Sequence, residues 1–169
     1  MTAEEIKQQL GLVPHPREGG WFVQTWASNE ILGPASFAPG RYAGLRRTAT
    51  AIYYLLEPET LSEMHRLRSD EVFHHYAGDP VEMLQLAPSG EGRRVVLGRD
   101  LAAGERPQVV VEREIWQGSR LVPGGSWALL GCTVSPGFDY ADYDSGARAE
   151  MLAGWPQWAE LITALTHSS

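Results

Sequence analysis

Cysteine and clustered basic residues are both scarce in this sequence, and their scarcity limits the classes of protein to which it can belong. It contains a single cysteine, Cys132, so no disulfide can form within the chain. That residue lies in the apolar run 127–134, where a buried, unreactive thiol is the usual arrangement. Lys and Arg together number 14, in no run longer than a pair, and the net charge is −7. Because nucleic-acid binding relies on clustered basic side chains, this composition argues against a nucleic-acid partner.

The sequence also lacks a long hydrophobic run. No apolar stretch approaches the about 20 residues that a bilayer-spanning helix needs. The acidic start, residues 1–7, lacks the basic and then apolar layout of a secretion signal. We therefore expect a cytoplasmic protein with no membrane partner.

Turn-forming residues, in contrast, are abundant. The 18 Gly and 11 Pro are scattered between short apolar runs, in a sequence that is 43% hydrophobic and 21% charged. This is the composition of a globular chain with many short strands. Because the 169 residues contain no linker, we expect one domain, 1–169, with a barrel at about 20–140 and C-terminal helices at about 146–167.

Seven short strands are predicted from runs rich in Val, Leu, Tyr and Trp that Gly and Pro separate. The runs are 49–56, 61–67, 71–77, 81–87, 93–97, 108–111 and 127–135. No helix-length pattern lies between them. The order therefore favours an antiparallel sandwich or barrel over alternating strands and helices.

Short helices are predicted at both ends of the chain. Thr2 and Glu5 have the spacing of a capping box, and Gly11 ends the first helix. Near the C-terminus, Pro156 suits the first turn of a helix whose apolar residues at 158, 161, 162 and 165 share one face. We expect that face to dock on the outside of a sheet. The Gly- and Pro-rich stretch 29–45 predicts a long loop of the kind that forms lids or interface arms.

The most informative motif is His65-x-Leu67-x3-Glu71-x6-Gly78. It resembles the first cupin motif, His-x-His, three or four residues, Glu, six residues, Gly. Alternate residues of a strand share a face, so His65 and position 67 face the same side. Imidazole and carboxylate are ligands for Mn, Fe, Zn or Ni. Leucine, however, cannot bind a metal.

The second cupin motif ends in Pro-x-Gly-x2-His, and here the matching segment is Val111-Glu-Arg-Glu-Ile-Trp-Gln117. Glu112 and Glu114 replace the Pro and Gly, and Gln117 replaces the last metal ligand. The sequence thus departs from the metal pattern at two of four positions. We expect no cofactor; a divalent transition metal, if one binds, would be held by His65, Glu71 and Gln117.

Over nearly its whole length the sequence resembles a cupin branch of unknown function, whose fold is like that of the RmlC-type dTDP-sugar epimerases. The matching segments include Pro14-His-Pro-Arg-Glu-Gly-Gly20 and Trp116-Gln117-Gly118, and the others lie at 46, 50–56, 65–74, 77–80, 97–101 and 131–139. The resemblance implies an all-β double-stranded β-helix, or jelly roll, commonly dimeric, with a ligand-sized cavity.

We expect three polar side chains, His65, Glu71 and Gln117, to converge inside this barrel. A histidine next to a carboxylate is the arrangement that a general base needs, so His65 and Glu71 are the candidate catalytic residues. Gln117 suits hydrogen bonding to a polar ligand. The remaining candidate ligand-binding residues are Arg46 with His74 or His75 at the rim, and Tyr54, Phe73 and Trp116 as apolar walls.

The pair His74 and His75 leaves one question open. Adjacent residues of a strand face opposite sides. If Glu71 faces inward, regular alternation brings Phe73 and His75 inward as well, whereas the family resemblance favours His74. A bulge in the strand would decide between them.

The residues are consistent with functions from different classes. One is a metal-independent epimerase or isomerase that acts on a small polar molecule of the sugar, nucleobase or carboxylate type. The second is a non-catalytic module that binds or senses such a molecule, and the third and weakest is a metal-dependent oxygenase. The aromatic residues Trp21, Phe22 and Trp26 further predict a homodimer that packs or exchanges N-terminal strands.

Overall fold

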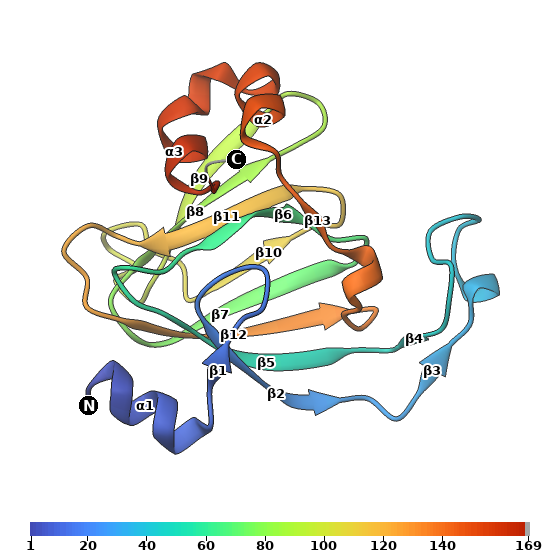
Figure 1. Ribbon diagram of the computed structural model, residues 1–169, viewed down its shortest axis with the longest axis horizontal. Coiled ribbons are helices and arrows are strands. Elements are labelled where there is room, and N and C mark those ends of the chain that lie inside the picture. The colour runs from blue at the N-terminus through green and yellow to red at the C-terminus, as the bar shows by residue number, and fades with distance from the viewer. Residues whose placement is uncertain (168–169) are drawn as a thin grey trace.

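Two antiparallel sheets face each other in the computed structural model, which describes residues 1–167 (Figure 1). The first sheet has the order β1 (Val13–Pro14), β2 (Trp21–Ala27), β5 (Thr50–Leu56), β12 (Ala128–Ser135), β7 (Asp70–Gly78) and β10 (Gln108–Val111). The second has the order β13 (Asp144–Ser145), β6 (Ser62–Arg66), β11 (Trp116–Leu121), β8 (Val81–Leu86) and β9 (Gly92–Leu97). The predicted all-β jelly roll with short terminal helices is confirmed.

The arm at residues 28–47 extends away from the sheets (Figure 1). It contains β3 (Ile31–Leu32), a 3-10 turn η1 (Pro34–Ser36) and β4 (Arg46–Arg47), and β3 pairs with β4. The stretch predicted as a long loop therefore has its two ends joined by a short two-stranded sheet.

The terminal helices cover the two sheets from outside. α1 (Ala3–Leu10) begins with the predicted capping box, in which Thr2 and Glu5 each accept the other's backbone N–H. The C-terminal segment comprises α2 (Arg148–Gly154), η3 (Pro156–Trp158) and α3 (Ala159–Ala164). Ile162 and Leu165 pack on Met64 and Leu84 of the second sheet, so the predicted docking of this face is confirmed. None of the described helices combines the length and the apolar character that crossing a membrane requires.

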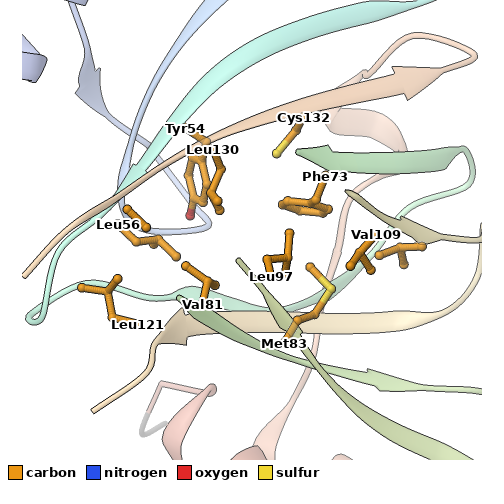
Figure 2. Close-up of a cluster of buried hydrophobic side chains, with 12 residues drawn as sticks. Tyr54, Leu56, Phe73, Val81, Met83, Leu97, Val109, Leu121, Leu130 and Cys132 are labelled. Atoms are coloured by element: carbon orange, nitrogen blue, oxygen red, sulfur yellow. The ribbon is translucent and has the colours of Figure 1, made fainter. Parts of the chain in front are cut away.

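The space between the sheets is filled over much of its length by apolar side chains (Figure 2). Leu56, Phe73, Leu97 and Leu130 are at most 1% exposed and come from both sheets. Every predicted strand is present with its ends shifted by at most two residues. The strand β11 was not among them, because its inner face carries the polar Gln117 and Ser119 rather than an apolar alternation.

Candidate functional site

One end of the barrel interior is hollow and polar. A cavity of about 140 Å³ lies where β5 and β7 begin and where β6 and β12 end. Histidine and carboxylate side chains line it, together with apolar ones. The lining residues are His15, Glu18, Phe22, Gln24, Thr50, Ile52, His65, Leu67, Glu71, Cys132, Val134, Phe138 and Tyr140.

Local strand geometry explains how polar residues reach this space. On β7, Glu71 and Phe73 are buried at alternate positions, as strand periodicity requires. On β6, His65 pairs with Gln117 of β11, and Ser62 pairs with Ser119 of β11. β6 therefore has one residue more than β11 between these two pairs. This β-bulge allows Ser62 and His65, three residues apart, both to be buried on the inner side.

The three polar residues expected to converge do converge. The Gln117 side-chain amide donates a hydrogen bond to Glu71 Oε2 at 2.5 Å, and the same nitrogen lies 3.4 Å from His65 Nε2. All three side chains belong to residues that are at most 7% exposed. Gln117 lies behind the cavity wall and connects the two lining residues.

The hydrogen bonds of His65 determine which ring nitrogen carries its proton. His65 Nδ1 lies 2.7 Å from the Glu63 carbonyl oxygen. Because a carbonyl only accepts, Nδ1 of the neutral ring must be the protonated nitrogen. The lone pair is then on Nε2, which meets the long 3.4 Å contact with Gln117. The Tyr143 ring stacks on His65 with centroids 4.8 Å apart and restricts its orientation.

Glu71 lies in surroundings that favour its neutral form. Burial raises the pKa of the Glu71 carboxyl from its ordinary 4.5 to about 8, and the charge of Glu18 acts in the same direction. Hydrogen bonds from Gln117 and Cys132 act against this rise. Burial likewise raises the pKa of the Cys132 thiol well above its usual range, which agrees with the predicted unreactive thiol.

Two lining residues, His15 and Glu18, were not identified as site residues from the sequence. They belong to the segment Pro14-His-Pro-Arg-Glu-Gly-Gly20, which folds over the end of the barrel. Tyr54 fixes this segment because its hydroxyl donates to the Gly19 carbonyl at 2.7 Å. Gly19 has φ +99°, and a Cβ there would lie 2.2 Å from the Leu61 carbonyl oxygen, so glycine is required.

His15 and Glu18 are themselves held in fixed positions. His15 Nδ1 accepts the Glu18 backbone N–H at 2.8 Å, which leaves the proton of the neutral ring on Nε2. Burial lowers the pKa of His15, which favours this neutral form. Glu18 Oε1 accepts the Ser62 hydroxyl at 2.5 Å, while its Oε2 lies 3.9 Å from His15 Nε2. A Pro-flanked histidine three residues before a glutamate was the available sequence signal.

Arg46, expected at the rim as a ligand partner, does not line the cavity. Its guanidinium is 5% exposed and donates to both Asp142 carboxylate oxygens, at 2.7 and 2.8 Å. Asp142 lies in η2 (Tyr140–Asp142), beside Phe138 and Tyr140 at the cavity mouth. Arg46 therefore anchors the segment that covers the mouth, and its charge is already neutralised by that segment.

Trp116, expected as an apolar wall, points away from the cavity. It packs with the cluster beneath the C-terminal helices, and the Arg66 guanidinium lies 4.7 Å from its ring centre. Tyr54 and Phe73 do face inward, but they belong to the packed apolar core beside the cavity rather than to its lining. The Tyr54 ring lies 6.4 Å from that of His15.

The question of His74 and His75 is answered by regular alternation. His75 is 6% exposed and inward, whereas His74 lies outside, stacked against Tyr76 at 6.1 Å. The register shift in β7 comes after His75, between the residues that pair with Leu129 and Leu130. Neither histidine lines the cavity. His75 is four residues beyond Glu71, which is roughly 13 Å along a strand.

The donor set does not fit the metal that the cupin motifs imply. Leu67 occupies the second ligand position and packs in an apolar cluster. At the last position, the amide nitrogen of Gln117 faces Glu71 and His65, and a protonated amide nitrogen is not a metal ligand. Within residues 1–167, no group of three or more His, Cys, Asp or Glu side chains is arranged to hold a metal ion.

Comparisons with known proteins agree with this architecture. A family model described as Cupin superfamily (DUF985) matches residues 4–145. The uncharacterized protein YML079W of Saccharomyces cerevisiae is 29% identical over 150 residues, which cover 84% of this chain and 74% of that protein. Protein SO0799 from Shewanella oneidensis has a crystal structure with a TM-score of 0.86 and 32% identity, covering 100% of this chain and 99% of that one.

A more distant structure shows the fold alone. A cupin 2 domain-containing protein from Halorhodospira halophila has a TM-score of 0.54 and 13% identity, covering 94% of this chain and 96% of that one. The two sheets thus follow an arrangement that sequences with little in common can adopt.

Proposed function

The chain belongs to the DUF985 family of the cupin superfamily, and on that premise we propose that its barrel binds a small polar molecule and moves a proton on it. His65 would be the general base and Glu71 the general acid of a metal-independent epimerase or isomerase. The single observation that supports this most is the orientation of His65. Its Nδ1–H is bound to the Glu63 carbonyl, which directs the basic Nε2 lone pair toward the Glu71–Gln117 pair.

The protonation states support the same division of roles. With a pKa of about 8, Glu71 holds its proton at neutral pH and can donate it. His65 offers a lone pair at the same end of the barrel. An isomerisation that removes a proton from one atom and returns one to another needs such a pair, acid and base in one site.

The size of the cavity limits the ligand. Its volume of about 140 Å³ is close to the roughly 150 Å³ of an engineered protein cavity that admits benzene. The substrate would therefore be a molecule of about five to eight non-hydrogen atoms, such as a short polyol, a small heterocycle or a short acid or amine. A sugar nucleotide is far too large for it.

A non-catalytic binding module is the second candidate. The observation that favours it is the contact of Gln117 with His65 Nε2 at 3.4 Å, which occupies part of the lone pair that a base would use. In that reading His65 would only accept a hydrogen bond from the ligand.

Proton exchange with solvent separates these two functions. Dihydroxyacetone, pyruvate and aminoacetone each carry hydrogen next to a carbonyl and are of the right size. We expect the protein to speed deuterium incorporation from D₂O into at least one probe that binds, as followed by proton NMR. His65→Gln should slow it by about 100-fold or more, and His75→Gln, outside the cavity, should not. A probe that binds beside His65 without exchanging would instead support the binding module.

We further propose that the protein is a homodimer. Three side chains on strands of the first sheet, Trp26, Tyr76 and Val110, are 52%, 48% and 46% exposed, and Ile31 and Leu45 on the arm are 54% and 64% exposed. Exposed apolar side chains in such number are typical of a protein contact. Sedimentation at micromolar concentration should give twice the chain mass of 18.6 kDa, and a monomer would contradict the proposal.

A further inference from the structure

The cavity is lined by acidic side chains and, among the described residues, by no Lys or Arg. Glu18 and Glu71 both line it and are 9% and 7% exposed. Arg46 lies near the mouth but is paired with Asp142, and Arg17 is a solvent-exposed residue that lies over Tyr140 at 5.4 Å. An anionic ligand inside the cavity would therefore meet two carboxyl groups and no cation.

Neither carboxyl group has a Lys or Arg partner among the described residues, so each is available to a positively charged ligand. Glu18 Oε2 lies 3.9 Å from His15 Nε2, beyond hydrogen-bond distance, and accepts no hydrogen bond within the described chain. The Glu71 carboxyl has a raised pKa because it is buried beside Glu18 with no cation to stabilise its charge. A positively charged N–H group in the cavity would stabilise the Glu18 carboxylate, and the neutral Glu71 carboxyl could still accept a hydrogen bond from it.

Four aromatic rings in contact with one another form part of the cavity wall, and one of them, His15, lies next to Glu18. The Phe22 ring lies 4.6 Å from the His15 ring, which lies 6.2 Å from the Tyr140 ring, which lies 4.9 Å from the Phe138 ring. All four residues line the cavity. Aromatic faces attract cations through their negative π-electron surface, and cages of such rings recognise ammonium groups.

We propose that the ligand of this cavity is a small organic cation, a protonated amine, whose charged nitrogen lies toward Glu18 and Glu71 and whose carbon skeleton lies against the aromatic wall. This inference rests on the proposed function in one respect, that the cavity is the ligand site. Of the polar molecules that the sequence left open, it selects those with an amino group and rejects the carboxylate type.

Three probes of one shape and different charge test the inference. Isobutylammonium and isobutanol have the same skeleton with NH₃⁺ in place of OH, and isobutyrate carries the opposite charge. Binding is followed by NMR at neutral pH and fixed ionic strength, from the shifts of cavity residues. We expect isobutylammonium to bind about tenfold more tightly than isobutanol, with isobutyrate the weakest. Isobutanol or isobutyrate binding as tightly, or no binding of isobutylammonium, would overturn the inference.

The variant Glu18→Gln tests whether the charge of Glu18 causes the preference for isobutylammonium. In Glu18→Gln the side-chain oxygen can still accept the Ser62 hydroxyl, so the fold of the segment is retained. We expect this variant to bind isobutylammonium about tenfold more weakly and isobutanol unchanged. Glu59→Gln removes the same charge from an exposed turn and is the matched control, which should change neither. Equal losses in both variants would assign the effect to net charge and contradict the inference.

Failure of the cation inference can be distinguished from failure of the proposed proton transfer. Dihydroxyacetone is uncharged, so its His65-dependent deuterium exchange does not depend on cation binding. Exchange without a preference for isobutylammonium would overturn the cation inference alone. A preference for isobutylammonium without exchange of any bound probe would overturn proton transfer alone.

Discussion

His65 lies at the polar end of the barrel interior and His75 lies toward the other end, and these two buried histidines differ in what the second ring nitrogen meets. His65 and His75 are 1% and 6% exposed, and each donates one N–H to a backbone carbonyl, of Glu63 and Asp79. His65 then presents Nε2 beside a cavity with two carboxyl groups. The second nitrogen of His75, Nδ1, is buried and has no hydrogen-bond partner among residues 1–167. Burial alone therefore does not single out His65 as the proposed base; the surroundings of its second ring nitrogen do.

The two ends should also differ in how they stabilise the fold. Phe73 is 1% exposed within the packed core, whereas Phe138 is half-buried and borders the cavity. We expect Phe73→Ala to lower the free energy of unfolding by about 3 to 5 kcal/mol, and Phe138→Ala by about 1 to 2 kcal/mol. Chemical denaturation measures both. Equal losses would mean that the polar end is packed as tightly as the core.

At the polar end the buried ion pair between Arg46 and Asp142 contributes to the stability of the fold, as apolar packing does in the core. Arg46→Met leaves Asp142, 5% exposed, without its cation, and should lower the free energy of unfolding by about 3 to 5 kcal/mol. The double variant Arg46→Met with Asp142→Leu removes both charges and should recover most of this loss. A double variant as unstable as the sum of the singles would show that the two residues act independently.

Glu71 should make the polar end sensitive to pH. Because its folded-state pKa of about 8 is above the ordinary 4.5, its favourable contribution is complete below about pH 4.5 and is lost as pH rises through about 8. Glu71→Gln cannot ionise. The free energy of unfolding of this variant relative to the native protein should therefore rise by on the order of 4 kcal/mol between pH 5 and pH 8.5.

Denaturation curves at several pH values give this difference directly. Glu112→Gln, which changes an exposed carboxylate, is the control and should show no comparable trend. A flat difference for Glu71→Gln would mean that the Glu71 carboxylate is stabilised as well in the folded state as in water.

The smallest expected effect concerns backbone strain in the exposed turn before β11. Glu114 has φ +64°, in the left-handed region, and its N–H donates to the Leu67 carbonyl. It occupies the position at which the cupin motif has glycine, which adopts this conformation without steric cost. Glu114→Gly should raise the free energy of unfolding by about 0.5 kcal/mol, and Glu114→Val should lower it. A destabilising glycine would show that other contacts of Glu114 outweigh the strain.

The sequence was sufficient for the strands whose apolar runs end at Gly or Pro, and for His65 and Glu71, which strand alternation and the motif spacing bring inward together. It was not sufficient where contacts are long-range. His15 and Glu18 reach the cavity because residues distant in sequence, among them Tyr54 and Ser62, hold their loop across the barrel end.

Trp116 shows a second limit. An apolar side chain on a strand can face either side when both faces of the sheet are covered. The second sheet is covered by the barrel interior on one face and by the C-terminal helices on the other. Composition alone therefore could not tell that Trp116 packs outward beside the polar Gln117, which faces in.

The protonated nitrogen of His65 is the most direct test of the central claim. In protein labelled with ¹⁵N histidine, the ring nitrogen shifts and their couplings to ring protons distinguish the two neutral forms. We predict a proton on Nδ1 of His65 and on Nε2 of His15, since Nδ1 of His65 donates to a carbonyl and Nδ1 of His15 accepts a backbone N–H. A proton on Nε2 of His65 at neutral pH would leave no lone pair at the polar end and contradict its role as a base.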